Sequence, residues 1–313
     1  MRSQNTKSMI EGALLAAITI ILSILALYMP VIGIFATLVW PVPIVILGIR
    51  HGFRISFLST VVAGVFVAIL SGPLQAFTVV LGFGFIGIAM GWAIKKDFSP
   101  FKILIIGAIS SLISKVLLIG SSMLIMGINP ITEEITLMKE SLTMIENMYN
   151  GMGLNPESTK ATIEQFSSAL DLMVLVFPGL LLIVSLMDSF LTYQVTKAVL
   201  SRLGQKIKDF TPFWQWQLPS YTVALFLLGK LFTMLEVYWP LGILNFIGLN
   251  LMVIFSVAFF IQGFSLLAYF LGRWNVSKIL RIIIILLIFF NPIVTQLIFW
   301  AGMLDILFNF RHI

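Results

Sequence analysis

Long apolar runs recur along the whole chain, and they limit its fold more than any other feature. A run of about 20 apolar residues is long enough to cross the hydrocarbon core of a membrane as an α-helix. Cut at charges and at Pro/Gly turns, the sequence gives about nine such runs: 9–29, 33–49, 53–71, 74–94, 102–126, 170–197, 219–238, 247–271 and 279–304. With 59% hydrophobic and 10% charged residues, the chain has too little polar surface for a globule in water. The sequence therefore predicts an all-α, polytopic bundle of transmembrane helices in the lipid bilayer.

The distribution of basic residues predicts the orientation of this bundle. If the N-terminus is cytoplasmic, one face collects most of the 19 Lys and Arg residues. The long loop on the other face, 127–169, is acidic. Because cytoplasmic loops are enriched in Lys and Arg, we expect the N-terminus inside. Topology then explains the net charge of +6, and no nucleic-acid partner is expected.

The outer segment 127–169 has the pattern of an amphipathic helical hairpin. Thr132 is a candidate N-cap, followed by apolar residues at helical spacing. The chain is expected to break at 150–153, and a second helix to begin at Asn155-Pro156. Two interpretations stay open: the hairpin lies on the membrane surface, or it forms a lid over an externally open cavity.

The polar stretch 201–218 divides the chain into two predicted parts. Residues 1–200 hold six spans and the hairpin, and residues 201–313 hold a cytoplasmic linker and three further spans. No repeat of 20–50 residues stands out in the sequence.

Motifs that would carry catalysis are absent from the sequence. There is no phosphate-binding Gly-Lys-Ser/Thr loop, no His-Glu-x-x-His and no Gly-x-Ser-x-Gly. The two histidines, His51 and His312, each stand beside an arginine at a membrane edge, and there is no cysteine. We therefore expect neither an enzyme nor a bound metal or cofactor. The run Gly82-Phe-Gly84-Phe-Ile-Gly87 matches a dinucleotide fingerprint but lies inside a span, where close helix packing is the better interpretation.

Two spans each carry a charged residue next to a polar stripe. Lys115 lies beside a face of Gly and Ser residues that includes Ser121, and Asp188 lies in a stripe of Ser and Thr residues. A charge inside a span costs about 2.5–3.5 kcal/mol on insertion scales, so each needs a partner or water. At 1.5 Å per residue, Lys115 is about 20 Å and Asp188 about 13 Å from the inner surface. We expect the two residues to pair or to line one polar cavity, either as a substrate or ion site or as a salt bridge that sets helix register.

The later spans carry further polar residues and two helix breakers. Lys230 and Glu236 lie about 240° apart around a helix, so each needs a partner of its own. Pro178 and the pair Asn291-Pro292 are expected to kink their helices.

A resemblance to a known family rests on three stretches of sequence. These are Glu11-Gly-Ala13-Leu-Leu-Ala-Ala17, the Pro-bearing turn and span that follow it, and Ser71-Gly-Pro-Leu-Gln75 before a Gly-rich span that ends in Lys95-Lys96. Over roughly residues 9–200 they resemble the substrate-capture (S) subunits of energy-coupling-factor vitamin transporters. Across its whole length the chain resembles the YybS-like family of Bacillus-type membrane proteins.

The resemblance to S subunits implies a partner and a ligand. Ala13 and Ala17 match the family's Ala-x-x-x-Ala motif, which implies docking of the first helix on a transmembrane coupling subunit that works with separate ATPases. It also implies a small-molecule site near the outer surface, in zones that include Trp40 and Ser121. Together with Lys115 and Asp188, these two are the candidate substrate-binding residues. The acidic hairpin and the three spans after residue 218 depart from the family's pattern.

We therefore expect a multi-pass protein of the bacterial plasma membrane that binds a small molecule or takes part in its transport. The alternative is a non-transporting membrane scaffold, or an assembly factor for cell-envelope processes, in which the polar stripes serve helix–helix contacts. A cavity lined by Lys115 or Trp40 would favour capture, and a sealed interior would favour the scaffold.

Overall fold

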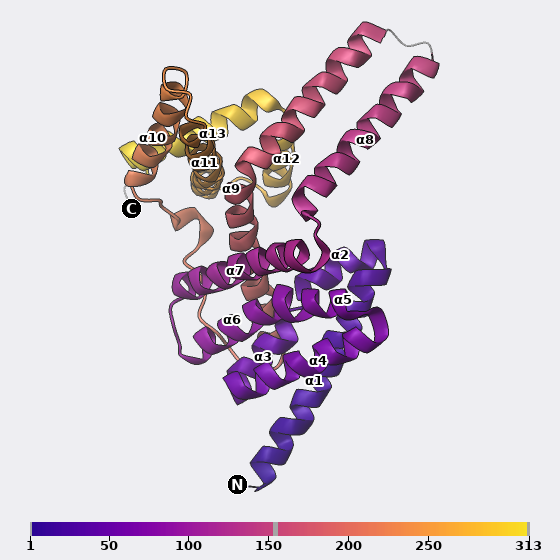
Figure 1. Ribbon diagram of the computed structural model, residues 1–313. Helices are drawn as coiled ribbons and strands as arrows, with labels where there is room; N and C mark the ends of the chain where they lie inside the picture. The colour runs from indigo at the N-terminus through magenta and orange to yellow at the C-terminus, as the bar shows by residue number, and fades with distance from the viewer. Residues whose placement is uncertain (1, 153–155, 312–313) are drawn as a thin grey trace. The chain divides into compact units, whose positions relative to one another are not determined.

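The computed structural model describes residues 2–152 and 156–311, and this part of the chain forms helices and no strand (Figure 1). In chain order the helices are α1 (Arg2–Tyr28), α2 (Pro30–Val39), α3 (Val42–His51), α4 (Phe53–Ser71), α5 (Pro73–Phe77), the π-helix η1 (Thr78–Gly84), α6 (Phe85–Lys95), α7 (Pro100–Met126), α8 (Pro130–Gly151), α9 (Pro156–Arg202), the 3-10 turn η2 (Phe213–Gln215), α10 (Tyr221–Leu235), α11 (Ile243–Arg273), α12 (Lys278–Phe290) and α13 (Pro292–Phe308). The predicted all-α fold is confirmed. His312 and Asn155 lie outside the described residues.

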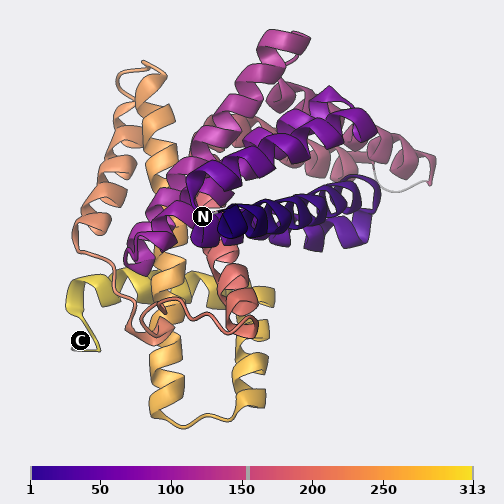
Figure 2. The ribbon, with the colours of Figure 1, turned by 90° about the horizontal axis from the view of Figure 1, so that it is seen from below.

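The number of spans is lower than predicted. Among the described residues, seven helices are long and apolar enough to cross a membrane, or up to eight if the pair α12–α13 counts as one span. The run 219–238 forms only the 15-residue helix α10, which at about 22 Å is shorter than the hydrocarbon core. The predicted kink at Asn291-Pro292 is confirmed as a bend of 104° between α12 and α13, which Figure 2 shows.

The outer segment is helical, but the expected second helix of its hairpin is not a separate element. α8 covers the predicted first helix. α9 runs without interruption for 47 residues, so the second helix of the hairpin and the sixth span are one helix. The hydropathy of the sequence changes near residue 170, and this change marks a new environment along α9 rather than a helix end.

The chain forms two compact units. Unit 1 comprises Met1–Glu140 and Val184–Asp209, and unit 2 comprises Ser141–Ile183 and Phe210–Ile313. Both α8 and α9 contribute residues to each unit. The division at residue 200 into two functional parts stays a prediction.

In unit 1 the helices pack closely through faces that carry small residues. α1 packs on α2, α3 and α4, while α6 packs on both α3 and α7. At the contact of α3 with α6, a Cβ on Gly87 would lie 2.9 Å from the Cβ of Ile44, so only glycine lets these two backbones approach. The packing interpretation of the glycine-rich span is therefore confirmed.

Unit 2 has an aromatic core. α11 packs on α10 and α13, and the rings of Phe226, Phe259 and Phe299 lie 5.3–5.8 Å apart between their centroids. Where α11 crosses α13, a Cβ on Gly302 would lie 2.6 Å from the backbone nitrogen of Gly263. Glycine at this crossing brings the two backbones into contact and lets the phenylalanine rings interlock.

Pro178 does not end α9, because a side chain of α11 completes the hydrogen bonding there. The Gly179 N–H donates to Oδ1 of Asn250 at 2.6 Å, and Nδ2 of Asn250 donates to the carbonyl of Leu175 at 2.9 Å. The carboxamide thus takes the place of the helix's own bond from Gly179 to Leu175. The Gly179 N–H and the Leu175 carbonyl therefore both have partners, as an apolar environment requires.

Candidate functional site

Unit 1 contains a cavity of about 280 Å³, close to the lower end of the range for small-molecule sites. The lining is mostly apolar, with one cation, one anion and three threonines. It consists of Thr37, Leu38, Pro41, Thr78, Gly82, Phe83, Ile86, Lys115, Leu118, Val184, Asp188, Leu191 and Thr192. These residues come from α2, the break between α2 and α3, η1, α6, α7 and α9, so segments far apart in the sequence line one cavity.

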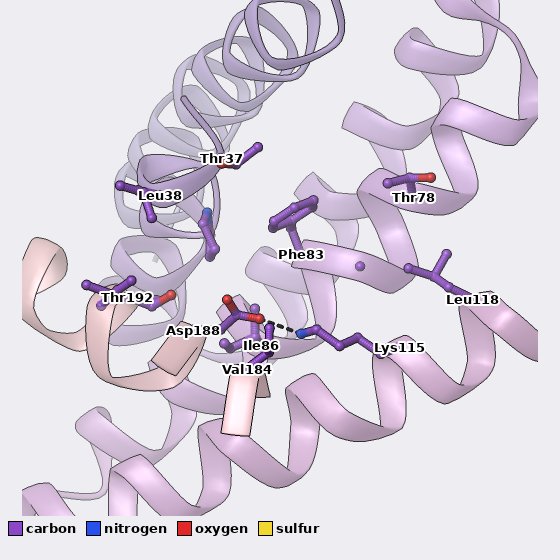
Figure 3. Close-up of a pocket in the computed structure, with 13 residues that line it drawn as sticks. Thr37, Leu38, Thr78, Phe83, Ile86, Lys115, Leu118, Val184, Asp188 and Thr192 are labelled. Carbon is purple, nitrogen blue, oxygen red and sulfur yellow. Dashed lines mark hydrogen bonds and ion pairs between the residues drawn. The ribbon is translucent and has the colours of Figure 1, made fainter. Parts of the chain in front are cut away.

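Lys115 and Asp188 form an ion pair in this wall (Figure 3). The Lys115 ammonium also donates to Oγ of Ser111 at 2.6 Å, and Oγ of Ser111 donates to Oδ2 of Asp188 at 3.0 Å. The predicted pairing of the two charges is confirmed, and both residues line one cavity, although its wall is mostly apolar rather than polar.

The distances of the two charges from the inner membrane surface stay a prediction, but their distances from the ends of their own helices are nearly equal. Measured along the helices from Pro100 and Arg202, Lys115 lies about 22 Å and Asp188 about 21 Å from the ends of α7 and α9. Asp188 lies this far from its helix end because α9 extends beyond the span predicted to end at residue 197. Both charges therefore lie well inside their helices.

The polar stripes of α7 and α9 mainly hold helices together. Gly107 leaves room for Ser189, whose Oγ donates to the carbonyl of Leu104 at 2.9 Å. Ser114 donates to the carbonyl of Gly82 at 3.1 Å. These hydroxyls are used in packing, which leaves the Lys115–Asp188 pair as the charged feature of the cavity.

The cavity lies at two irregular stretches of backbone. One is the break between α2 and α3 at Trp40-Pro41, where Pro41 has no amide hydrogen to continue the helix. The other is the π-helix η1, whose Leu81 and Gly82 carbonyls accept hydrogen bonds from Ser114. π-Helical segments and discontinuous membrane helices are both frequent at functional sites. The sequence did not predict the π-helix.

The other two candidate binding residues lie outside the cavity lining. Trp40 is 2% exposed and stacks on Phe83 with ring centroids 4.1 Å apart. Because Phe83 lines the cavity, Trp40 packs against a residue of the wall without lining the cavity itself. Oγ of Ser121 donates to the carbonyl of Leu118 in its own helix at 2.8 Å. The structure thus brings Lys115 and Asp188 together but not Ser121, and a ligand-binding role for any of the four residues stays a prediction.

Sequence reasoning missed a buried charge cluster in unit 2, the Asp305 cluster, formed by Gln262, Ser265, Asp305 and Arg311. Nη2 of Arg311 donates to Oδ2 of Asp305 at 2.7 Å, and Nε2 of Gln262 donates to the same oxygen at 2.6 Å. Asp305 fell just beyond the predicted last span and Arg311 farther on, so neither counted as a charge within a span. The sequence signal for this ion pair was the presence of Asp305 and Arg311 six residues apart at the end of a span.

The Asp305 cluster holds the segment that follows unit 1 in sequence. Arg311 donates to the carbonyls of Trp214 at 2.6 Å and Trp216 at 2.8 Å, and to Oγ of Ser265 at 2.8 Å. All four side chains of the cluster are buried. The arrangement is that of a structural clamp on residues 213–216.

Glu236 has partners that the sequence did not predict. The Glu236 carboxylate accepts from the backbone N–H groups of Gly242 at 2.6 Å and Asn245 at 3.1 Å, at the beginning of α11. A carboxylate is favourable there because the N-terminal end of a helix dipole is positive. Lys230, also expected to find a partner, is exposed.

Glu11, in the N-terminal half of α1, joins this helix to α3. Its carboxylate lies 2.7 Å from Nε2 of His51 and also pairs with Arg50, both in the last turn of α3. Among the residues that the structure describes, no group of three or more His, Asp or Glu side chains could hold a metal ion.

Comparison with known proteins agrees with the full-length resemblance. The model of a family described as "Predicted membrane protein (DUF2232)" matches residues 17–306. The protein described as "Uncharacterized protein YybS", from Bacillus subtilis (strain 168), is 28% identical over 312 residues, which cover 99% of each chain. No solved structure matches. The predicted similarity to YybS-like proteins is confirmed, whereas the similarity to S subunits stays a prediction.

Proposed function

We propose that this chain, which belongs to the family of predicted membrane proteins DUF2232, captures a small polar molecule in the cavity of unit 1. Its family, and the seven or eight membrane-length apolar helices among the described residues, make it a multi-pass integral membrane protein. The observation that carries the proposal is the Lys115–Asp188 pair, which lines a cavity rather than a packed helix interface.

The exposure of this pair favours a binding role over a purely structural one. A salt bridge that only sets helix register is expected to be enclosed by packed side chains, with no open space beside it. Here the side chains of Lys115 and Asp188 are 23% and 40% exposed. A ligand carboxylate can compete for the ammonium, or a ligand cation for the carboxylate, at little further cost of desolvation. The apolar remainder of the wall fits a small ligand with an apolar body and one charged group.

The resemblance to S subunits supports a coupling partner for this capture protein. Ala13 and Ala17 are exposed on α1, as a docking face requires. The expected flat face is narrower than predicted, because Gly12 and Ala16 are buried, and a Cβ on Gly12 would lie 3.2 Å from Oγ of Ser59 in α4. Docking would therefore use Ala13 and Ala17 alone.

The test of ligand binding uses full-length protein in mild detergent, screened with small charged molecules for a rise in thermal stability. A ligand at 100 times its Kd stabilises the folded state by about 2.7 kcal/mol. The double variant Lys115→Met/Asp188→Leu is expected to fold, because replacing both charges together is often neutral or stabilising. It is expected to lose the ligand response.

The matched control is Lys230→Met, which removes an exposed lysine in unit 2 and is expected to keep the response. If the double variant still responds to every ligand that stabilises the wild type, the cavity is not the binding site. If no compound stabilises the wild type while envelope proteins co-purify with it, the scaffold alternative replaces the proposal.

The docking proposal has its own experiment. Ala17→Trp places a large side chain on the exposed face of α1 and is expected to abolish co-purification of a transmembrane partner. Ile69→Trp serves as control, because Ile69 is 74% exposed on another helix. Equal recovery of the partner with both variants would refute docking through Ala17.

A further inference from the structure

Unit 1 has a second cavity, the basic cavity, at the end where α3, α6 and α9 end and α7 begins. Its volume is about 440 Å³, and it lies at a different set of residues from the cavity that contains Lys115. It is lined by Ile49, Ile94, Lys95, Asp97, Phe98, Ile103, Tyr193, Leu200, Gln205, Lys206, Ile207 and Lys208. The distribution of basic residues predicts that this end of the unit is cytoplasmic.

The basic cavity has a rigid apolar floor. Ile103, Tyr193 and Leu200 are at most 2% exposed. The hydroxyl of Tyr193 donates to the carbonyl of Lys208, which ties the segment after α9 to that helix. Nζ of Lys208 in turn donates to Oδ2 of Asp97 at 2.7 Å. These two bonds link α9, the segment that follows it and the turn after α6 around the cavity.

The charge of the rim is unbalanced. Three lysines line the cavity, against the single carboxylate of Asp97. Lys208 already pairs with that carboxylate. Lys95 and Lys206 form no ion pair with any residue in the described part of the chain. Two exposed lysines therefore lie at the cavity without a counter-charge from any acidic residue in the described part of the chain.

We infer that the basic cavity binds a phosphate group, carried either by an anionic lipid headgroup or by a soluble phosphate compound. Two uncompensated ammonium groups supply the charge and the donors that a phosphate anion needs. The first turn of α7, which contributes Ile103, adds the positive end of its dipole. The apolar floor fits the part of a lipid just below its headgroup, and basic pockets between membrane helices on the cytoplasmic side suit anionic lipids. This site is independent of the capture proposed for the Lys115 cavity.

The test measures ligand binding by the full-length protein in mild detergent, by native mass spectrometry and by thermal stabilisation. Three probes are added separately: phosphatidylglycerol, phosphatidylcholine and inorganic phosphate. The variant Lys95→Gln/Lys206→Gln removes the two unpaired lysines. The control Lys96→Gln/Lys102→Gln removes the same charge near the same helix ends, from residues that do not line the cavity.

The wild type and the control are expected to bind phosphatidylglycerol in preference to phosphatidylcholine. The Lys95→Gln/Lys206→Gln variant is expected to bind it about 30-fold more weakly. If only inorganic phosphate stabilises the wild type, and this effect is lost in the Lys95→Gln/Lys206→Gln variant, the ligand is a soluble phosphate compound. That outcome would support the site equally. Equal weakening in both double variants, or no effect of any probe on the wild type, would overturn the inference.

Discussion

The Asp305 cluster makes a quantitative prediction about the stability of unit 2. Arg311 donates hydrogen bonds to Asp305, to Ser265 and to the carbonyls of Trp214 and Trp216. The change Arg311→Met removes all of them with little change in the length of the side chain. The Asp305 carboxylate is then left fully buried, with Gln262 as its remaining donor.

The cost of this change follows from what is left unpaired. Breaking a buried ion pair by removing one partner costs about 3–5 kcal/mol, because the other charge stays buried. The double variant Asp305→Leu/Arg311→Met removes both charges, so this part of the cost is recovered. What remains is the loss of the donor to the Trp214 carbonyl and of the acceptor for Nε2 of Gln262, about 1–3 kcal/mol for each unsatisfied group. The Trp216 carbonyl keeps Oγ of Ser265 as a donor. We therefore expect the double variant to be more stable than the Arg311→Met single variant.

The assay is unfolding by denaturant in mild detergent, followed by tryptophan fluorescence, because Trp214 and Trp216 lie in the clamped segment. Chymotrypsin cleavage within residues 210–218 reports local release of the same segment. Arg273→Met is the control: Arg273 is exposed, so its replacement is expected to change the stability by no more than about 0.5 kcal/mol. A double variant that is less stable than the single one would refute the reasoning from an unpaired charge.

Three further predictions concern helix contacts, each measured as a change in the free energy of unfolding in detergent. Asn250→Leu removes the carboxamide that bonds to the Gly179 N–H and the Leu175 carbonyl of α9. It is expected to cost about 1–3 kcal/mol for each backbone group left unpaired in an apolar environment. No loss of stability would mean that these two backbone groups pair with each other without the amide. Gly302→Ala is expected to destabilise by about 1–3 kcal/mol through overpacking, whereas Gly120→Ala, with nothing within 4 Å of the added Cβ, is expected to be neutral or to stabilise by up to about 1 kcal/mol. Equal effects of these two alanines would argue against the close crossing. Glu236→Gln removes the charge at the beginning of α11 and is expected to cost about 0.3–1 kcal/mol, less at high salt; an effect independent of salt would contradict the dipole argument.

The pairing of Lys115 with Asp188 could be predicted because a charge in an apolar span has few ways to be satisfied. Each residue lies far from a helix end, and each needs a partner of opposite sign. Asp305 escaped the same reasoning because it follows a predicted span end, where water normally solvates a carboxylate. The fold instead buries Asp305 beside Arg311, which binds the distant segment at Trp214 and Trp216. Hydropathy carries no information about such a long-range contact.

The continuity of α9 and the π-helical hydrogen bonding of η1 could not be predicted from the sequence either. The segments on either side of residue 170 differ in hydropathy, yet α9 passes through both, because a helix pairs its backbone groups within the segment in either environment. The π-helix η1 likewise leaves no mark in the pattern of apolar residues, since a local change from i+4 to i+5 bonding moves side chains by a fraction of a turn. The break at Asn291-Pro292 was predictable because proline and a capping asparagine act locally.

The two small-residue faces of α1 have a consequence for how mutations in this helix would be interpreted. Gly12 and Ala16 are buried, whereas Ala13 and Ala17, one position along, are exposed. Substitutions at adjacent positions of α1 therefore affect different properties of the protein. In a substitution scan of α1, bulky residues at the first pair would lower the amount of folded protein in the membrane. At the second pair they would leave that amount unchanged, so any phenotype would point to association with another molecule rather than to folding.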